Sequence, residues 1–569
     1  MRKNILIIFS LFLFGVVTSL QAQQTVTPAQ QQKIREILKE AYPDSLPGSS
    51  MMLIQNSQVI MTETHGMANM EERIPIRPEH VFAIGSTSKQ FTAVGILVLV
   101  QQGKVDLKED ITKYIPDYNT HGRHITVENL ITHTSGIRSF TEMQGFSEMI
   151  TTDKSMEEIR KSFEDSTLLF EPGSMWSYSN SGFFLAAYII EKVSGQSYAN
   201  FIREHLFKPA GMDHTCFGSN TDIIMNRAQG YDAGGEHGLE RTRPYSWSWP
   251  IGAGNIMSTT ADMAAWNNAL LSGKIIRPEL LKQAYTPFRL TNGQDTHYGY
   301  GWQINKVGNF RVIAHGGAIG GYLADAIYLP EKNIYLVSLT NTTAVSSIDQ
   351  MRKCVLVLLD QPTGDPAVVN TKTNLKEYEG VYEVNLLGGR LVTNSGNDKI
   401  YRNVFVEDNR LYIQRSGRSK TELLSSGSDD FFIKDSPQRF HFNRDKKKKV
   451  VSMDVYNYPM AFGPVDVNRK TDLPLPVAGQ EIKVPAGILR KYLGVYELAP
   501  GFTLEFSLDG DRFYAQATGQ DKFEVFAKSE TSFFLKVVDA KIDFKMDAAG
   551  TVTGLTLTQG RKMEAKKIR

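Results

Sequence analysis

A short motif occurs twice in the last third of the chain, and this repeat constrains the architecture more than any other feature. The run Leu-Lys-Glu-Tyr-Glu-Gly-Val-Tyr-Glu at 375–383 returns as Leu-Arg-Lys-Tyr-Leu-Gly-Val-Tyr-Glu at 489–497. Residues within 442–455 match residues within 544–557 at a shorter offset, so the first copy carries about a dozen extra residues between its matched ends. Self-similarity over such a distance indicates that one folding unit has been duplicated.

Each copy consists of short apolar stretches separated by turn residues, which is typical of a small all-β barrel or sandwich. We therefore predict two small barrel-like domains, at 372–470 and 482–569, with a Pro-containing linker at 472–476. The turn-rich run Pro-Thr-Gly-Asp-Pro at 362–366 separates them from the first part of the chain. A chain of 569 residues is too long for one hydrophobic core, which agrees with several domains.

The part of the chain between 23 and 361 is predicted to form one α+β domain. Strands are expected at both of its ends, and helices dominate from Ser86 to about Leu271. The expected strands are 50–54, 59–63, 300–305, 311–314, 324–329 and 334–339, and the expected terminal helices are 28–42 and 347–359. An antiparallel sheet with flanking helices and a helical insertion satisfies that order.

Residues 1–22 have the composition of a signal peptide. Arg2 and Lys3 precede a short apolar stretch, and the small Ala22 precedes polar residues. We expect cleavage there, no stable membrane span afterwards, and a periplasmic or secreted protein; an uncleaved anchor helix is the alternative. Cys216 and Cys354 are the two cysteines, and the apolar surroundings of Cys354 favour a buried free thiol over a bridge, which an oxidising compartment would permit.

The charge balance argues against nucleic acid as a partner. The chain has 63 Lys and Arg residues against 61 Asp and Glu residues, a net charge of +2. The four lysines at 446–449 stand between two strand patterns and are expected at a solvated hairpin tip. His121 and His124 are the closest histidine pair, but no companion ligands stand at metal spacing, so we expect no metal site and no cofactor.

A Ser-x-x-Lys spacing joins Ser86 to Lys89. The spacing alone carries little weight, because roughly two such matches are expected by chance in a chain this long. Here, however, it lies where the apolar run 81–84 meets the helical pattern of 90–99. Residues i and i+3 at a helix start share a face, helix-end amides favour a developing anion, and a desolvated lysine amine can take up a proton. Ser86 is therefore a candidate nucleophile; a serine that merely caps a core helix is the alternative.

Two further motifs follow in the chain. Tyr178 and Asn180 form a Tyr-x-Asn motif before an apolar helix; a phenol beside a lysine can relay protons, and an asparagine offers a donor and an acceptor to a substrate amide. The run His-Gly-Gly-Ala at 315–318 ends the strand expected at 311–314. Its glycines would let a substrate backbone lie against the strand edge, and the amides of Ser86 and Ala318 would form an oxyanion hole.

Together, these motifs resemble those of the serine β-lactamase and penicillin-binding protein superfamily, in its class C, D-aminopeptidase and esterase-like branch. The runs 130–136, 206–212 and 252–259 are similar to the same family, and the resemblance spans about 50–359. The two repeats resemble the lipocalin-like barrels appended to some members.

The resemblance implies an exported serine hydrolase in which Ser86 forms an acyl-enzyme. Lys89 and Tyr178 would share the base work, and Asn180 would orient Lys89 and the substrate amide. The residues implied for substrate binding and the oxyanion are Asn180, His315, Gly317 and Ala318. The substrate would be a small molecule or peptide with an amide or ester bond, such as a cell-wall compound that contains D-amino acids.

One departure from the family pattern bears on the substrate. The third motif of class C β-lactamases and many DD-peptidases begins with Lys, whereas here it begins with His315. An unperturbed histidine is mostly uncharged near neutral pH, so the cation that would pair with a substrate carboxylate is weakened. Efficient hydrolysis of β-lactams is therefore in doubt.

Other functions stay open at this point. A carboxylesterase of the same fold would use the same residues, and a non-turnover penicillin-binding or sensing protein would stay acylated on Ser86. In a third alternative, the two repeats bind a partner and the first domain is their scaffold. An α/β-hydrolase is disfavoured because no Gly-x-Ser-x-Gly motif occurs. The oligomeric state is left open.

Overall fold

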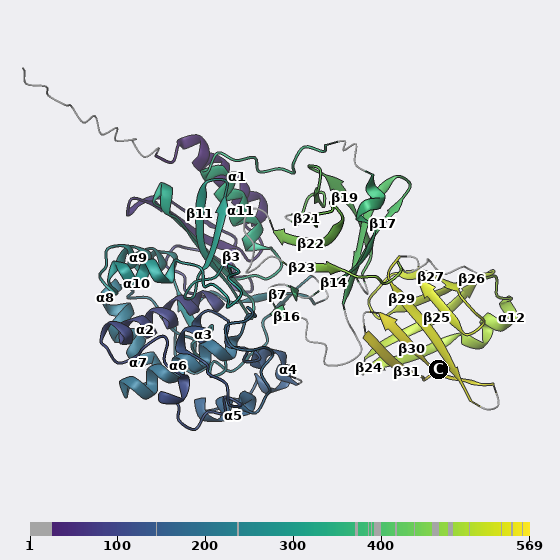
Figure 1. Ribbon diagram of the computed structural model, residues 1–569, viewed down its shortest axis with the longest axis horizontal. Helices are drawn as coiled ribbons and strands as arrows, with labels where there is room; N and C mark the ends of the chain where they lie inside the picture. Colours follow the sequence, from purple (N-terminus) through teal and green to yellow (C-terminus); the bar gives the residue numbers. More distant parts are fainter. Residues whose placement is uncertain are drawn as a thin grey trace, which may run out of the picture.

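The computed structural model describes residues 25–569 except 144, 236–237, 370–373, 385, 388–389, 392–399, 416–417, 437, 458–465, 476–481, 500, 536, 548–549 and 560 (Figure 1). The predicted signal peptide at 1–22 lies outside the described residues, as does the end of the predicted linker at 472–476. Within the described part, no helix has the length and apolar character that a membrane crossing requires.

A six-stranded sheet organises the first domain, with strand order β10-β11-β12-β13-β1-β2 and every neighbouring pair antiparallel. The strands are β1 (Ser49–Gln55), β2 (Gln58–His65), β10 (Gln303–Val307), β11 (Phe310–Ile319), β12 (Tyr322–Leu329) and β13 (Ile334–Thr340). The two ends of the first domain thus meet in one sheet. β1 pairs with β13 from Ser49 opposite Thr340 to Gln55 opposite Ile334. The predicted α+β fold is confirmed.

Two terminal helices cover one face of this sheet. They are α1 (Pro28–Ala41) and α11 (Ser347–Leu358), which lie beside β11 in Figure 1. α1 begins at Pro28, the first residue of the helix expected at 28–42. Thr27 and Gln30 stabilise this start through a reciprocal capping box, and Pro28 occupies the first turn. Ile34 and Leu38 of α1 share a buried core with Leu336 of β13 and Val355 of α11.

The helical insertion packs on the other side and carries the main core. Its principal helices are α2 (Lys89–Gln101), α3 (Val127–Ile131), α5 (Met156–Glu164), α6 (Asn180–Ser194), α7 (Tyr198–Ile202), α9 (Thr260–Leu271) and α10 (Pro278–Ala284). Every residue of α2 from Lys89 to Leu99 is buried, which explains why its sequence is apolar all round instead of amphipathic. α6 and α7 approach α2 closely at Gly95, where a Cβ would stand 2.9 Å from the side chains of Ile190 and Ile202.

Two predicted strand boundaries are wrong for physical reasons. The strand expected at 300–305 begins only at Gln303, because Gly301 turns the chain with φ +82°. The strand expected at 311–314 continues to Ile319 through both glycines, since its second half pairs with β12 as far as Ile319 opposite Tyr322. The His-Gly-Gly-Ala run is therefore part of β11 and does not lie at its end.

The two sequence repeats form two closed eight-stranded barrels. The first contains β14 (Gly380–Val384), β17 (Tyr401–Glu407), β18 (Arg410–Arg415), β19 (Lys420–Ser425), β20 (Asp430–Phe432), β21 (Gln438–Arg444), β22 (Val450–Asn457) and β23 (Asp466–Lys470). The second contains β24 (Gly494–Ala499), β25 (Phe502–Asp509), β26 (Arg512–Ala517), β27 (Lys522–Ala527), β28 (Ser532–Leu535), β29 (Ala540–Met546), β30 (Val552–Gln559) and β31 (Arg561–Lys567). Two barrel-like domains are thus confirmed.

Matching contacts support the duplication. Tyr382 donates a hydrogen bond to the carbonyl of Tyr378 (2.7 Å), and Tyr496 repeats this contact with Tyr492 (2.9 Å). Gly380 lies opposite Val404 where Gly494 lies opposite Phe506, so the extra residues of the first copy fall between β14 and β17. The chain forms the short strands β15 (Leu386–Leu387) and β16 (Arg390–Leu391) within that insertion.

The structure also places the four lysines at 446–449 and the two cysteines. Residues 445–449 are exposed in the turn between β21 and β22, as expected for a hairpin tip. Cys216 and Cys354 are both free, and Cys354 lies on the buried side of α11. Burial raises the pKa of the Cys354 thiol to about 12, which leaves it protonated and unreactive.

Candidate active site

Ser86 and Lys89 lie where the chain enters the helical insertion. Ser86 is half-buried in the short 3₁₀ turn η1 (Gly85–Ser88), and Lys89 is the first residue of α2 and fully buried. Because one turn separates them, Lys89 Nζ reaches Ser86 Oγ and donates a hydrogen bond of 3.1 Å. The sequence spacing therefore predicted a real contact.

The Lys89 amine contacts two more oxygen atoms. Nζ donates to Asn180 Oδ1 (2.8 Å) and to the carbonyl of Ala253 (2.9 Å). A buried ammonium group is costly unless hydrogen bonds replace its water, and these acceptors supply them. They also aim the amine at Ser86.

Tyr178 lies over the same lysine. Lys89 Nζ is 4.8 Å from the centre of the Tyr178 ring, and the ring is half-buried. Tyr178 precedes Ser179, the N-cap of α6, whose Oγ accepts a hydrogen bond from the amide of Gly182 (3.2 Å). The start of α6 thus brings both Tyr178 and Asn180 to the lysine.

Asn180 is fixed by a neighbouring loop. Its backbone amide donates to Ser139 Oγ (3.1 Å), and its side-chain Nδ2 donates to Thr141 Oγ1 (3.4 Å). Since Nδ2 is committed to Thr141, Oδ1 is the atom that faces Lys89.

β11 passes directly beside the serine turn. A Cβ on Gly317 would stand 1.9 Å from the carbonyl oxygen of Ile84, and a Cβ on Gly85 would stand 2.7 Å from the amide nitrogen of Ala318. Gly85 also has φ +48°, where a side chain is strained. The glycine of the third motif is therefore required for the approach of β11 to the serine turn, a reason that the sequence prediction did not include. Ala318 itself is exposed.

His315 lies in the interior and not at the surface. It is 2% exposed; its Nδ1 is 2.6 Å from the carbonyl of Gly316 and its Nε2 is 2.9 Å from the hydroxyl of Tyr298. Because a carbonyl can only accept, we assign the proton to Nδ1, and Nε2 then accepts from Tyr298. Burial, helped by the nearby Lys89 charge, lowers the pKa of His315 to about 3. The ring is therefore uncharged at neutral pH, as the sequence led us to expect.

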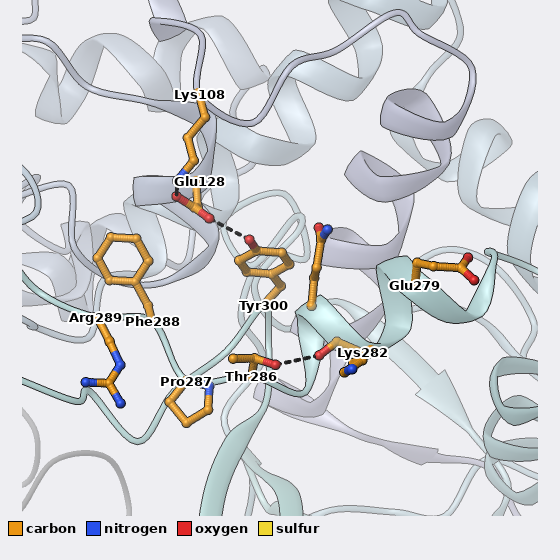
Figure 2. Close-up of a pocket in the computed structure, with 10 residues that line it drawn as sticks. Lys108, Glu128, Glu279, Lys282, Thr286, Pro287, Phe288, Arg289 and Tyr300 are labelled. Atoms are coloured by element: carbon orange, nitrogen blue, oxygen red, sulfur yellow. Dashed lines mark hydrogen bonds and ion pairs between the residues drawn. The ribbon is translucent and has the colours of Figure 1, made fainter.

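A hollow on this domain lies apart from the three motifs. A cavity of about 670 Å³ is lined by Lys108, Glu128, Glu279, Lys282, Gln283, Thr286, Pro287, Phe288, Arg289 and Tyr300, and contains none of the motif residues (Figure 2). The carboxylate of Glu128 has two partners within this hollow: Lys108 forms an ion pair with it, and the Tyr300 hydroxyl donates a hydrogen bond to Oε1 (2.5 Å). The candidate nucleophile Ser86 does not line this hollow.

Possible metal ligands, including the histidine pair His121 and His124, are placed as follows. In the parts of the chain that the structure describes, no group of three or more His, Cys, Asp or Glu side chains is placed to hold a metal ion. His121 and His124 lie in an exposed loop, where His124 contacts Asp110 and His121 contacts a backbone carbonyl.

Sequence reasoning missed several partners of the site. The carbonyl of Ala253 has no sequence signature, because any residue carries one. Tyr298, the partner of His315, stands in an alternation of aromatic residues and glycines at 298–302, which was a usable signal. Ser139 and Thr141 were missed because ordinary loop residues carry no mark of the helix start they support.

Fold and side-chain arrangement together define a class: the serine β-lactamase and penicillin-binding protein superfamily. The chain matches the beta-lactamase family over residues 31–353 and belongs to that family. Residues 478–568, the second barrel, match a domain of unknown function, DUF3471.

Individual relatives agree with this assignment. Penicillin-binding protein 4* of Bacillus subtilis is 28% identical over 404 residues, which are 68% of this chain and 87% of the relative. The D-amino acid amidase of Ochrobactrum anthropi is 26% identical, with a TM-score of 0.51, and the match covers 58% of this chain and 99% of the amidase. An octameric penicillin-binding protein homologue from Pyrococcus abyssi shares the fold at 24% identity and a TM-score of 0.53, over 78% of this chain and 99% of its own. Membership of this family supports hydrolase activity.

Proposed function

We propose that the protein is an exported serine hydrolase that acts on amide or ester bonds through an acyl-enzyme at Ser86. The observation that carries the proposal is the contact of 3.1 Å between Lys89 Nζ and Ser86 Oγ, with Tyr178 beside the same amine. A serine hydroxyl is a weak nucleophile until a neighbouring base takes its proton. Lys89 and Tyr178 are the two groups in place for that work.

In acylation, the bond from Ser86 Oγ to the substrate carbonyl carbon forms and the bond to the leaving nitrogen or oxygen breaks. The proton of Ser86 passes to the pair formed by Lys89 and Tyr178, and Tyr178 returns it to the leaving group. In deacylation, water adds to the same carbon, its proton returns to Ser86, and the acid is released. Electrons and protons balance without a cofactor.

The oxyanion of each tetrahedral intermediate would be held by the backbone amides of Ser86 and Ala318. The close packing of Gly85 against the Ala318 amide supports this role, because it brings the serine turn and the edge of β11 together. Two such donors fixed in advance stabilise the charge at no cost in reorganisation. Asn180 and Gly317 would flank the substrate on either side of Ser86.

The state of His315 bears on the substrate class. A buried, uncharged ring does not supply the cation that a β-lactam or a peptide carboxylate would pair with. This favours acyl groups without a carboxylate at that position, such as amides and esters of D-amino acids. The similarity to a D-amino acid amidase supports the same choice.

A carboxylesterase is the second candidate, and the same observation favours it. An ester needs no fixed cation beside the scissile bond, and its better leaving group makes less demand on Tyr178. The proposal of export rests on the composition of residues 1–22 and on the penicillin-binding relatives.

A panel of three substrate types tests the proposal. Purified protein is assayed with p-nitrophenyl esters, D-amino-acid anilides and a chromogenic cephalosporin, each beside Ser86→Ala. We expect Ser86-dependent turnover of esters or D-anilides and little turnover of the cephalosporin. A stoichiometric burst without turnover on all three would instead support a penicillin-binding or sensing protein.

A further inference from the structure

His133 contacts the chain on both sides of Tyr178. Its carbonyl accepts a hydrogen bond from the amide of Ser177 (2.9 Å), and its Nδ1 accepts one from the amide of Ser179 (3.0 Å). Because an amide donates, Nδ1 carries no proton, which sets the tautomer of the ring. The residues on either side of Tyr178, Ser177 and Ser179, are thus both hydrogen-bonded to His133.

The His133 ring also lies against the Tyr178 ring. The two ring centres are 4.3 Å apart with an angle of 36° between the planes. Tyr298 and Phe183 pack on His133 at 4.7 and 5.0 Å, and His133 is 1% exposed. The imidazole therefore has no room to turn away from Tyr178.

The backbone of His133 is left-handed just after the end of α3. α3 ends at Ile131, and His133 then adopts φ +61°, in the left-handed region. Glycine or asparagine ordinarily occupies such a position after a helix end, because a larger side chain is strained there. His121 and His297 also have a positive φ, so the contacts of the His133 ring, and not its backbone, carry the inference.

We propose that His133 is a positioning residue, which orients Tyr178 for proton transfer to the leaving group. This inference rests on the proposed function. Tyr178 has to return a proton to an amine or an alkoxide as the bond to the acyl carbon breaks. A p-nitrophenolate leaves as a stable anion and needs no such proton. Misplacing Tyr178 should therefore slow both acylations through its share of the base work, and should slow further the one whose leaving group needs a proton.

The test uses the full chain and two esters with the same acyl group, a p-nitrophenyl ester and a methyl ester. His133→Gly keeps the left-handed backbone and removes the ring. His133→Asn keeps the backbone and places an oxygen where Nδ1 accepts from Ser179. His121→Gly is the matched control, because His121 also has a positive φ (+53°) but lies in an exposed loop. Titration with a fluorophosphonate normalises each rate to the amount of folded, reactive enzyme.

We expect His133→Gly to lower kcat/KM for the methyl ester about 10- to 100-fold more than for the p-nitrophenyl ester, which is less than the full contribution of general acid catalysis because Tyr178 itself remains. His133→Asn should restore the wild-type ratio of the two rates, and His121→Gly should keep it. An equal loss on both esters after normalisation would overturn the proposal, because a merely structural role gives that result. Turnover in wild type that does not depend on Ser86 would refute the proposed function itself, which keeps the two failures distinct.

Discussion

At the scale of single residues, hydrogen-bond acceptors decide which buried groups of the site can hold a proton. Lys89 is fully buried yet has three oxygen acceptors, whereas His315 is buried beside that lysine and has only neutral partners. The same depth in the domain therefore supports a cation at one position and opposes it at the other. Of the two, the group that can hold a proton is therefore the amine that contacts Ser86.

His315 should make the protein sensitive to acid. Its ordinary pKa is 6.5 and burial lowers the folded-state pKa to about 3, so between these values the unfolded chain binds a proton that the folded chain does not. Stability should consequently rise with pH across that window, by up to about 1.4 kcal/mol per pH unit. In His315→Gln this contribution should vanish, as urea unfolding between about pH 4 and pH 6.5 would reveal. An unchanged slope relative to wild type would contradict the assignment of His315 as a buried neutral ring.

At the scale of elements, the site depends on the approach of β11 to the serine turn. Neither element holds the oxyanion donors alone, since Ser86 belongs to η1 and Ala318 to β11. Thr87 Oγ1 donates to the carbonyl of His315 (3.3 Å) and joins the two.

Gly317→Ala should separate them. The new Cβ would stand 1.9 Å from the Ile84 carbonyl, so β11 has to shift away from Ser86. We expect kcat/KM for a p-nitrophenyl ester to fall by about 100-fold or more, because one oxyanion donor is worth that much, and stability to fall by about 1–3 kcal/mol. Gly364→Ala is the control, because nothing lies within 4 Å of a Cβ there. If Gly317→Ala keeps wild-type kinetics, the close contact between β11 and the serine turn does not determine the geometry of the site.

The contact between β12 and α11 contains a second buried titrating group. Asp325 is 2% exposed and accepts a hydrogen bond from Ser347 Oγ (2.5 Å), and burial raises its pKa from 3.8 to about 7. Because the folded-state pKa is the higher one, this group's contribution to stability is lost as pH rises from about 4 through 7. Asp325→Asn should therefore gain stability over wild type at pH 8, with the exposed Asp44→Asn as control, measured by thermal unfolding. Equal melting temperatures for Asp325→Asn and wild type at pH 8 would contradict the raised pKa.

Sequence patterns predicted the elements well where one local rule decides them. The first residue of α1 and the proximity of Ser86 and Lys89 are decided by neighbouring residues, and the structure has both where the sequence predicts them. The length of β11 was predicted wrongly because paired glycines indicate a strand end, while the packing against Ile84 requires one of them inside the strand. The burial of His315 depends on Tyr298 and on the fold around it, which no local pattern contains.

At the scale of the whole molecule, the hydrolase domain and the barrels have separate cores. Buried residues of the first barrel, such as Tyr382 and Phe442, pack with one another, and those of the second form their own cluster around Phe506 and Phe544. The duplication visible in the sequence thus corresponds to two folding units appended to the family domain.

Removing everything after Gln361 should leave a folded hydrolase domain. We expect the p-nitrophenyl esterase activity of this fragment to stay within about threefold of the full chain, because all residues of the site lie before that point. Circular dichroism and a melting curve establish that the fragment is folded. A folded fragment without activity would mean that a barrel contributes to the site, which favours the alternative in which the repeats have a role of their own.

The nucleophile assignment is tested most directly by covalent labelling of Ser86. The full chain and Ser86→Ala are treated with a fluorophosphonate, followed by intact mass measurement and mapping of the modified peptide. The account predicts one adduct per chain, located on Ser86 beside Lys89, and none in Ser86→Ala. An adduct that persists in Ser86→Ala, or that maps to another residue in wild type, would contradict it.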